Sequence, residues 1–110
     1  MTKKINLALQ GGGAHGAFTW GVLDRLLEDD EIEIAGISGT SAGALNGAAL
    51  KAGLLTGGRE GARENLDWLW KDTIAKGEQK KALALALAAA NKTTKGFPRF
   101  FFFFFFFFFP

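Results

Sequence analysis

At 110 residues the chain can form one small domain, and a hydrophobic content of 48% suits a globular core. That content overstates the core, because eleven of the twelve phenylalanines lie at or after Phe97. The net charge is only +2 and the basic residues are scattered, so nucleic-acid binding is not expected. With no cysteine and one histidine, the sequence excludes disulfides and multi-histidine or thiolate metal sites, and we expect no cofactor.

The first forty residues predict two strands separated by a helix. Residues Ile5–Gln10 alternate apolar with smaller or polar side chains and stop at a glycine cluster, which is typical of a short strand. From Ala14 to about Asp29 the apolar residues recur at helical spacing, which predicts an amphipathic helix. Its apolar stripe is formed by Phe18, Val22, Leu23, Leu26 and Leu27. The run Glu31–Ile37 returns to alternation and predicts a second strand.

The rest of the chain is predicted to be mainly helical. Small residues at 44–53 predict a helix that lies close to the sheet and ends at Gly53, followed by a loop over 54–61. A half-buried helix is indicated by the spacing of Leu66, Leu69, Trp70, Thr73 and Ile74. The pairs Asp67–Lys71 and Asp72–Lys76 support this helix, and Gly77 interrupts it. The alanine-rich residues 78–91 also favour helix.

The order strand, glycine-rich turn, helix, strand defines a βαβ unit, whose strands are parallel and joined by a right-handed crossover. We therefore predict an α/β fold with flanking helices and an incomplete sheet. Three segments follow from composition: residues 1–76 as the domain, 77–95 as a helical or linker segment, and 96–110 as a low-complexity tail.

The strongest chemical motif is G-x-S-x-G, formed by Gly39, Ser41 and Gly43 between a predicted strand and a predicted helix. A serine on such a turn projects its hydroxyl from the backbone, and the helix that follows directs a partial positive charge at an alkoxide forming there. Ser41 is therefore a candidate nucleophile. The alternative is a turn of small residues that only packs helix on strand.

A second motif follows the first strand. Gly11, Gly13 and Gly16 match G-x-G-x-x-G, and Gly11, Gly12 and Gly13 leave amide N–H groups free to converge on an anion. Such a loop could bind a phosphate or nucleotide, or form an oxyanion hole. A dinucleotide site expects an acidic residue at the end of the second strand, but this strand runs into the serine motif. The oxyanion hole is therefore favoured, and both loops should emerge at the carboxyl edge of the sheet.

With these motifs, "LALQGGGAHGAFTWGVLDRLLE" and "GISGTSAGALNGAAL" resemble the start of a bacterial patatin-like phospholipase over about residues 5–75. The resemblance implies a serine acyl hydrolase of phospholipids or other lipid esters that uses a Ser–Asp dyad. By position it assigns Ser41 as nucleophile and Gly11, Gly12 and Gly13 as oxyanion-hole residues. His15 is expected to order the glycine loop, since the family works without a histidine base.

The sequence departs from this family in one respect. The family's dyad aspartate lies in a downstream Asp-Gly turn, and this chain contains no Asp-Gly pair. The five aspartates are predicted to be solvated charges on helices or at a helix end: Asp24, Asp29, Asp30, Asp67 and Asp72. We therefore expect a truncated patatin-like fold of low activity, in which family sequence ends between Ala75 and Lys95. The alternatives are a phosphate-binding module and a product without function.

The ten phenylalanines Phe100–Phe109 have high β-propensity, carry no charge and predict aggregation together with exposed strand edges. As a tail they are expected to be disordered or without selected function, although nearby cations would also suit peripheral contact with anionic lipid. No run reaches the length of a membrane-spanning helix or a signal-peptide core, so a cytoplasmic location, with peripheral membrane contact allowed, is the expectation.

Overall fold

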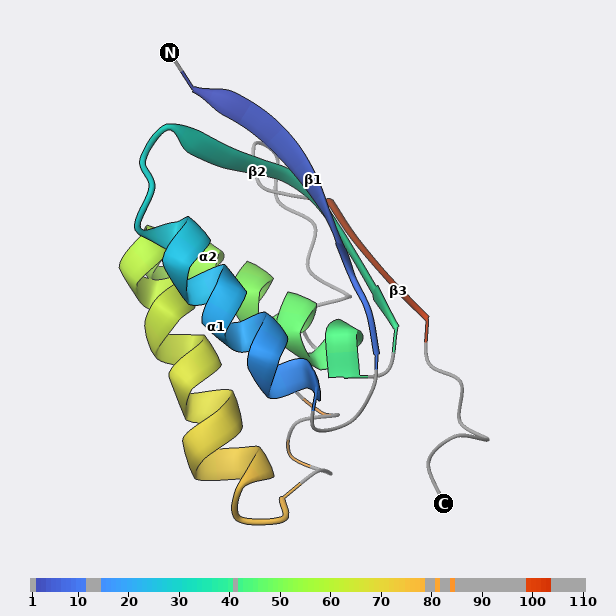
Figure 1. The fold of residues 1–110 in the computed structure, drawn as a ribbon. Helices are drawn as coiled ribbons and strands as arrows, with labels where there is room; N and C mark the ends of the chain where they lie inside the picture. The colour runs from blue at the N-terminus through green and yellow to red at the C-terminus, as the bar shows by residue number, and fades with distance from the viewer. Residues whose placement is uncertain are drawn as a thin grey trace.

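The structure, a computed structural model, describes residues 2–11, 15–40, 42–78, 81, 84 and 99–103. The elements in chain order are β1 (Lys3–Leu9), α1 (His15–Leu27), β2 (Ile32–Thr40), α2 (Ala42–Asp67), the π-helix η1 (Trp68–Ile74) and β3 (Arg99–Phe103). The strands form one layer, and α1 and α2 both pack on the same face of it (Figure 1). The predicted α/β fold with parallel strands and flanking helices is confirmed.

The sheet has the order β1-β2-β3, and both neighbouring pairs are parallel. In β1 the side chains of Ile5, Leu7 and Leu9 are partly or fully buried, while those of Lys4 and its alternating neighbours are exposed. This period of two is what a strand with one covered face requires. The predicted strand therefore exists, two residues earlier at its start than expected.

A β-bulge interrupts the pairing of β1 with β2. Ile5 pairs with Ile34, whereas Asn6 pairs with Gly36, so Ala35 is the extra residue. The bulge changes which residues of β2 face the helices, from the even-numbered Ile34 before it to the odd-numbered Ile37 after it. It explains why the apolar alternation of the sequence breaks at Ala35 and Gly36.

Helix α1 is rotated relative to the predicted stripe. Phe18 is 77% exposed and Val22 is 46% exposed, so their predicted place in the core is wrong. The side of α1 that faces the rest of the molecule instead carries Gly16, Trp20, Leu23 and Leu27, at spacings of four, three and four residues. The difference arises because α1 packs against α2 through Gly16, a position that hydropathy cannot mark as buried.

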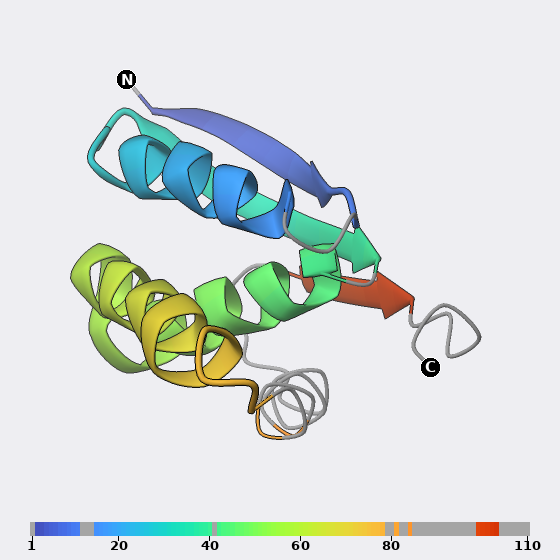
Figure 2. The same ribbon diagram turned by 60° about the horizontal axis from the view of Figure 1, so that its bottom comes forward.

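Helix α2 does not end at Gly53, and the loop predicted over residues 54–61 is reduced to a reversal at its centre. Only Gly57 and Gly58 leave helical geometry, with Gly58 at φ 63°. At this kink the chain reverses, and the second part of α2 runs back beside the first (Figure 2). A Cβ on Gly53 would lie 2.4 Å from the Cα of Ala62, so Gly53 serves close helix packing instead of termination.

The segment after α2 is helical and half-buried as predicted, but it is a π-helix. Its amide bonds span five residues: Ala75 N–H donates to the Trp70 carbonyl at 3.0 Å. The four residues Leu66, Leu69, Trp70 and Thr73 are buried, and Gly77 follows the segment at φ 74°. The predicted ion pairs form, with Nζ–Oδ1 distances of 3.1 Å for Lys71–Asp67 and 3.8 Å for Lys76–Asp72.

The start of the phenylalanine run forms a strand, which corrects the expectation that the whole tail lacks structure. Residues Arg99–Phe103 of β3 pair with Gly36–Thr40 of β2, so the carboxyl half of β2 is not an exposed edge. Phenylalanine favours strands, and β2 supplies the backbone partners. The predicted helical or linker segment 77–95 and the residues after 103 lie mostly or wholly outside the described residues. Within the described part of the chain, no helix is both long and apolar enough to span a bilayer.

Candidate active site

The two motifs lie at the same edge of the sheet. Leu9, the last residue of β1, pairs with Gly39 of β2, so both strands reach the carboxyl edge together. Gly11 follows two residues after Leu9, and the serine position follows two residues after Gly39. Gly12, Gly13 and Ser41 lie outside the described residues, whereas Gly11, Gly16, Gly39 and Gly43 are described. The structure therefore brings together the segments that flank the predicted site.

Gly43 holds the start of α2 against the end of β1. A Cβ on Gly43 would lie 2.0 Å from the carbonyl oxygen of Leu9, and one on Gly39 would lie 2.5 Å from the carbonyl oxygen of Gly43. Any side chain at these positions would collide with backbone. The outer glycines of the serine motif thus permit α2 to start directly against both strands.

The N-terminal part of α2 is buried. Every residue from Ala42 to Lys51 is less than a tenth exposed, and Ala44, Ala48, Ala49 and Leu50 are fully buried. Ala42, the first residue of α2, immediately follows the serine position. The positive dipole end of α2 therefore starts among buried residues, where electrostatic stabilisation is stronger than in water.

On the other side of the glycine loop, Gly16 is pressed against an aromatic ring. A Cβ on Gly16 would lie 2.7 Å from the Cη2 atom of Trp70. Trp70 in turn stacks with Trp20 of α1, with ring centroids 6.5 Å apart and planes inclined by 9°. The last glycine of the G-x-G-x-x-G motif is therefore needed for contact between α1 and η1, since a larger residue would displace the Trp70 ring.

Asn46 of α2 links α1 and η1 through two side-chain hydrogen bonds. Its side chain is fully buried; Nδ2 donates to the Gly16 carbonyl at 3.0 Å, and Oδ1 accepts from Trp70 Nε1 at 2.7 Å. A role for Asn46 was not predicted from the sequence. The available signal was a polar residue within a run of small apolar ones, five positions after Ser41.

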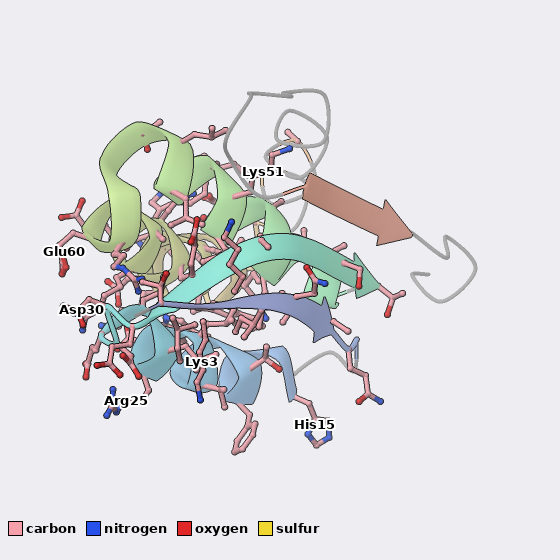
Figure 3. The ribbon with its side chains drawn as sticks, turned by 90° about the horizontal axis from the view of Figure 1, so that it is seen from above. Lys3, His15, Arg25, Asp30, Lys51 and Glu60 are labelled. Carbon is pink, nitrogen blue, oxygen red and sulfur yellow. The ribbon has the colours of Figure 1, made fainter. Side chains whose placement is uncertain are left out.

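The five aspartates lie on helices or at a helix end, and two of them are at the opposite edge of the sheet. Asp29 and Asp30 lie between α1 and the amino end of β2, opposite the serine end, and Figure 3 shows Asp30 and His15 at opposite ends of α1. Asp24 accepts from Arg63 Nε at 3.0 Å. Asp67 and Asp72 form the lysine pairs described above. The prediction that these aspartates lie on helix surfaces or at a helix end is confirmed.

His15 begins α1, is exposed, and points away from the body of the molecule (Figure 3). Its predicted partner, the glycine loop, includes residues outside the described ranges, so the role of ordering that loop stays a prediction. Within those ranges, no group of three His, Asp or Glu side chains is placed to hold a metal ion.

An open groove of about 610 Å³ lies between α1 and the second part of α2. Its lining includes the Trp20 ring and the charged side chains of Asp24, Arg63 and Lys71. None of the residues that line it belongs to the glycine loop or the serine turn. This groove is therefore separate from the predicted site.

The family model described as patatin-like phospholipase matches residues 7–106. The match continues beyond the interval between Ala75 and Lys95 in which the family sequence was expected to end, so that expectation is wrong. No curated protein and no solved structure matches the chain.

Proposed function

Because the chain belongs to the patatin-like phospholipase family, a family of lipid acyl hydrolases, we propose that it carries a serine-centred site for hydrolysis of lipid acyl esters. Ser41 would be the nucleophile, and amides of Gly11, Gly12 and Gly13 would form the oxyanion hole. The observation that carries this proposal is the pairing of Leu9 with Gly39, reinforced by the contact of Gly43 with Leu9, because it directs both motifs to one edge.

In the proposed reaction, the Ser41 hydroxyl oxygen attacks the ester carbonyl carbon and gives up its proton, which solvent water passes to the oxygen of the departing alcohol. The carbonyl oxygen becomes an oxyanion, which the glycine amides and the N-terminus of α2 would stabilise. Collapse of this intermediate breaks the bond to the alcohol, which leaves with a proton. Water then attacks the acyl-serine, releases the carboxylic acid and restores the hydroxyl group.

We propose further that the dyad aspartate is absent from this chain, so hydrolysis by it is slow. The placement of the five aspartates supports this, because each lies on a helix or at the amino edge of the sheet. General-base assistance contributes about 10²–10⁴-fold, and its loss leaves the hydroxyl a weak nucleophile.

Labelling with a fluorophosphonate probe tests the proposal. The chain contains two serines, so Ser38→Ala is a matched control for Ser41→Ala. Ser38 is half-buried in β2, where its hydroxyl donates to the Leu7 carbonyl at 3.5 Å. We expect slow labelling that persists in Ser38→Ala and disappears in Ser41→Ala, as read by intact-protein mass spectrometry.

Labelling of Ser38, or no labelling at all, would contradict the nucleophile assignment. Rapid stoichiometric labelling of Ser41 would instead show that a base has been overlooked. If calorimetry detected phosphate or nucleotide binding that Ser41→Ala did not change, the glycine loop would be an anion-binding module and the hydrolase proposal would fail.

A further inference from the structure

We propose that Asn46 is a positioning residue that fixes the C-terminal end of the glycine loop relative to the nucleophile helix. The inference rests on the proposed function for its chemical consequence, but its structural content concerns described residues alone. The side-chain amide of Asn46 would keep the loop amides aligned with the Ser41 oxygen while the rest of α2 packs on the sheet.

The two ends of the loop are held in different ways. At its first end, Leu9 is fixed by backbone pairing with β2 and by the close approach of Gly43. At its second end, Gly16 receives the Asn46 Nδ2–H bond at 3.0 Å and lies under the Trp70 ring. Asn46 and the serine position belong to consecutive segments, the start of α2 and the turn before it, so a shift of Gly16 relative to Asn46 is also a shift relative to the nucleophile.

The surroundings of Asn46 explain why this bond is specific. Its neighbours Ala44 and Ala48 on α2 are fully buried, and an unpaired amide among them would be costly. Both polar atoms of Asn46 are paired, one to Gly16 and one to Trp70. A fully paired buried network of this kind fixes one arrangement of the segments that it joins.

The π-helix contributes to the same arrangement. Trp70 lies within η1, where the helical turn contains an additional residue, as the bond from Ala75 N–H to its carbonyl shows. The indole of Trp70 is stacked on Trp20 and its Nε1–H reaches Asn46 at 2.7 Å. Single π-helical turns are frequent at functional sites. Here the π-helix carries the Trp70 side chain that donates to Asn46.

The test compares Asn46→Ala and Trp70→Phe with Asn65→Ala. Asn65 is a matched control on the same helix, since its Nδ2 donates to the Ala49 carbonyl at 2.8 Å but reaches neither motif. Trp70→Phe keeps an aromatic ring in η1 but removes the Nε1–H donor together with the part of the indole that lies against Gly16. Two readouts are needed: the maximal rate constant and half-saturating concentration of fluorophosphonate labelling, and amide hydrogen exchange of the loop peptide relative to β1 and β2.

We expect Asn46→Ala to lower the maximal labelling rate constant about 10- to 100-fold with little change in half-saturation, because misplacement of a catalytic group by about 1 Å costs on that order. Trp70→Phe should have a smaller effect in the same direction, and Asn65→Ala none. Exchange of the glycine-loop amides should rise selectively in both Asn46→Ala and Trp70→Phe.

Equal labelling constants for Asn46→Ala and Asn65→Ala would overturn the positioning role. So would an exchange increase spread evenly over β1 and β2, because it would indicate general destabilisation. If Asn46→Ala does not fold, Trp70→Phe decides the question. If the wild-type chain is not labelled at Ser41, the proposed function fails, while loop exchange still tests the link between Asn46 and Gly16.

Discussion

Individual glycines of the two motifs are required for space more than for backbone conformation. Among the described glycines, positive φ angles occur at Gly58 and Gly77, outside both motifs. Gly16, Gly39 and Gly43 instead lie where a Cβ would be within 3 Å of another residue. The sequence predicted that these glycines matter at a turn; it could not predict which segments approach them, because close approach depends on the packing of distant elements.

Gly43→Ala should lower the free energy of unfolding by about 3 kcal/mol or more, because the added Cβ would meet the Leu9 backbone, which cannot move without disturbing the sheet. Gly21→Ala is the control. Nothing lies within 4 Å of a Cβ on Gly21 in α1, so this change should stabilise the chain by about 0.5–1 kcal/mol. Urea unfolding followed by circular dichroism measures both, and equal effects would contradict the packing argument.

The burial of Lys51 predicts that the free energy of unfolding depends on pH. Its side chain belongs to a residue only 3% exposed, and burial lowers its pKa from the ordinary value of 10.5. Between the lowered pKa and 10.5 the unfolded chain binds more protons than the folded chain, so the contribution of Lys51 to stability rises as pH increases through that interval.

Lys51→Met removes this titration. The free energy of unfolding of the wild-type chain, minus that of Lys51→Met, should increase from neutral pH toward 10.5. Urea titrations at a series of pH values measure the difference. A difference that stays constant over this range, or falls, would show that burial does not lower the pKa of Lys51.

At the scale of elements, the second part of α2 is anchored to the turn between α1 and β2 by one side chain. The Arg59 guanidinium donates to the carbonyls of Leu27 and Asp29, at 3.4 and 2.8 Å, and to that of Ile32. Leu27 ends α1, Asp29 lies in the turn and Ile32 begins β2, so Arg59 ties the three segments together and places a cation at the negative dipole end of α1.

Arg59→Lys should lower the free energy of unfolding by about 1–3 kcal/mol, because lysine keeps the charge but cannot reproduce the forked donors. Arg25→Lys is the matched control: Arg25 makes an ion pair with Glu28 at 3.7 Å, with its side chain 74% exposed, and the change should alter stability by less than about 0.5 kcal/mol. Thermal and urea unfolding of both variants measure the difference, and similar losses would argue against an anchoring role.

Sequence periodicity identified the elements in the first half of the chain. It did not predict the rotation of α1 about its axis or the continuation of α2 past Gly53. The strand–helix–strand order followed from local alternation and spacing, which the sheet and helices preserve. The helix through Gly53 was missed because glycine is both a terminator and a packing residue, and only the nearby Ala62 distinguishes the two. The exposure of Phe18 was missed because the contact of Gly16 with Trp70 decides the rotation of α1.

For the whole molecule, the carboxyl edge of the sheet could be predicted, whereas the third strand could not. Parallel strands of a βαβ unit must end at one edge, so the meeting of the two motifs is a topological consequence. The pairing of β3 with β2 joins residues about sixty positions apart, and no local pattern specifies it. Asn46 was missed for the same reason, since its partners come from α1 and η1.

The phenylalanine run leads to two predictions, one about stability and one about association. Replacement of Phe100–Phe103 by serine should lower the melting temperature, because these residues belong to β3. Replacement of Phe104–Phe109 by serine should reduce association, since an uncharged run of high β-propensity promotes aggregation. Sedimentation velocity and thermal unfolding test both changes. A wild-type chain that remains monomeric at high concentration would contradict the aggregation prediction.

The bulge at Ala35 makes this position of β2 more tolerant of losing a residue than the positions after it. The Ala35 side chain is exposed, so replacing it with another small residue changes little. Deleting it would leave Ile34 and Ile37 two positions apart, so a regular strand would still turn both toward the helices, whereas deleting Ser38 would place Gly39 directly after Ile37 and turn it toward the opposite face of the sheet. Loss of one codon should therefore be tolerated at the bulge more readily than in the residues that lead into the serine turn.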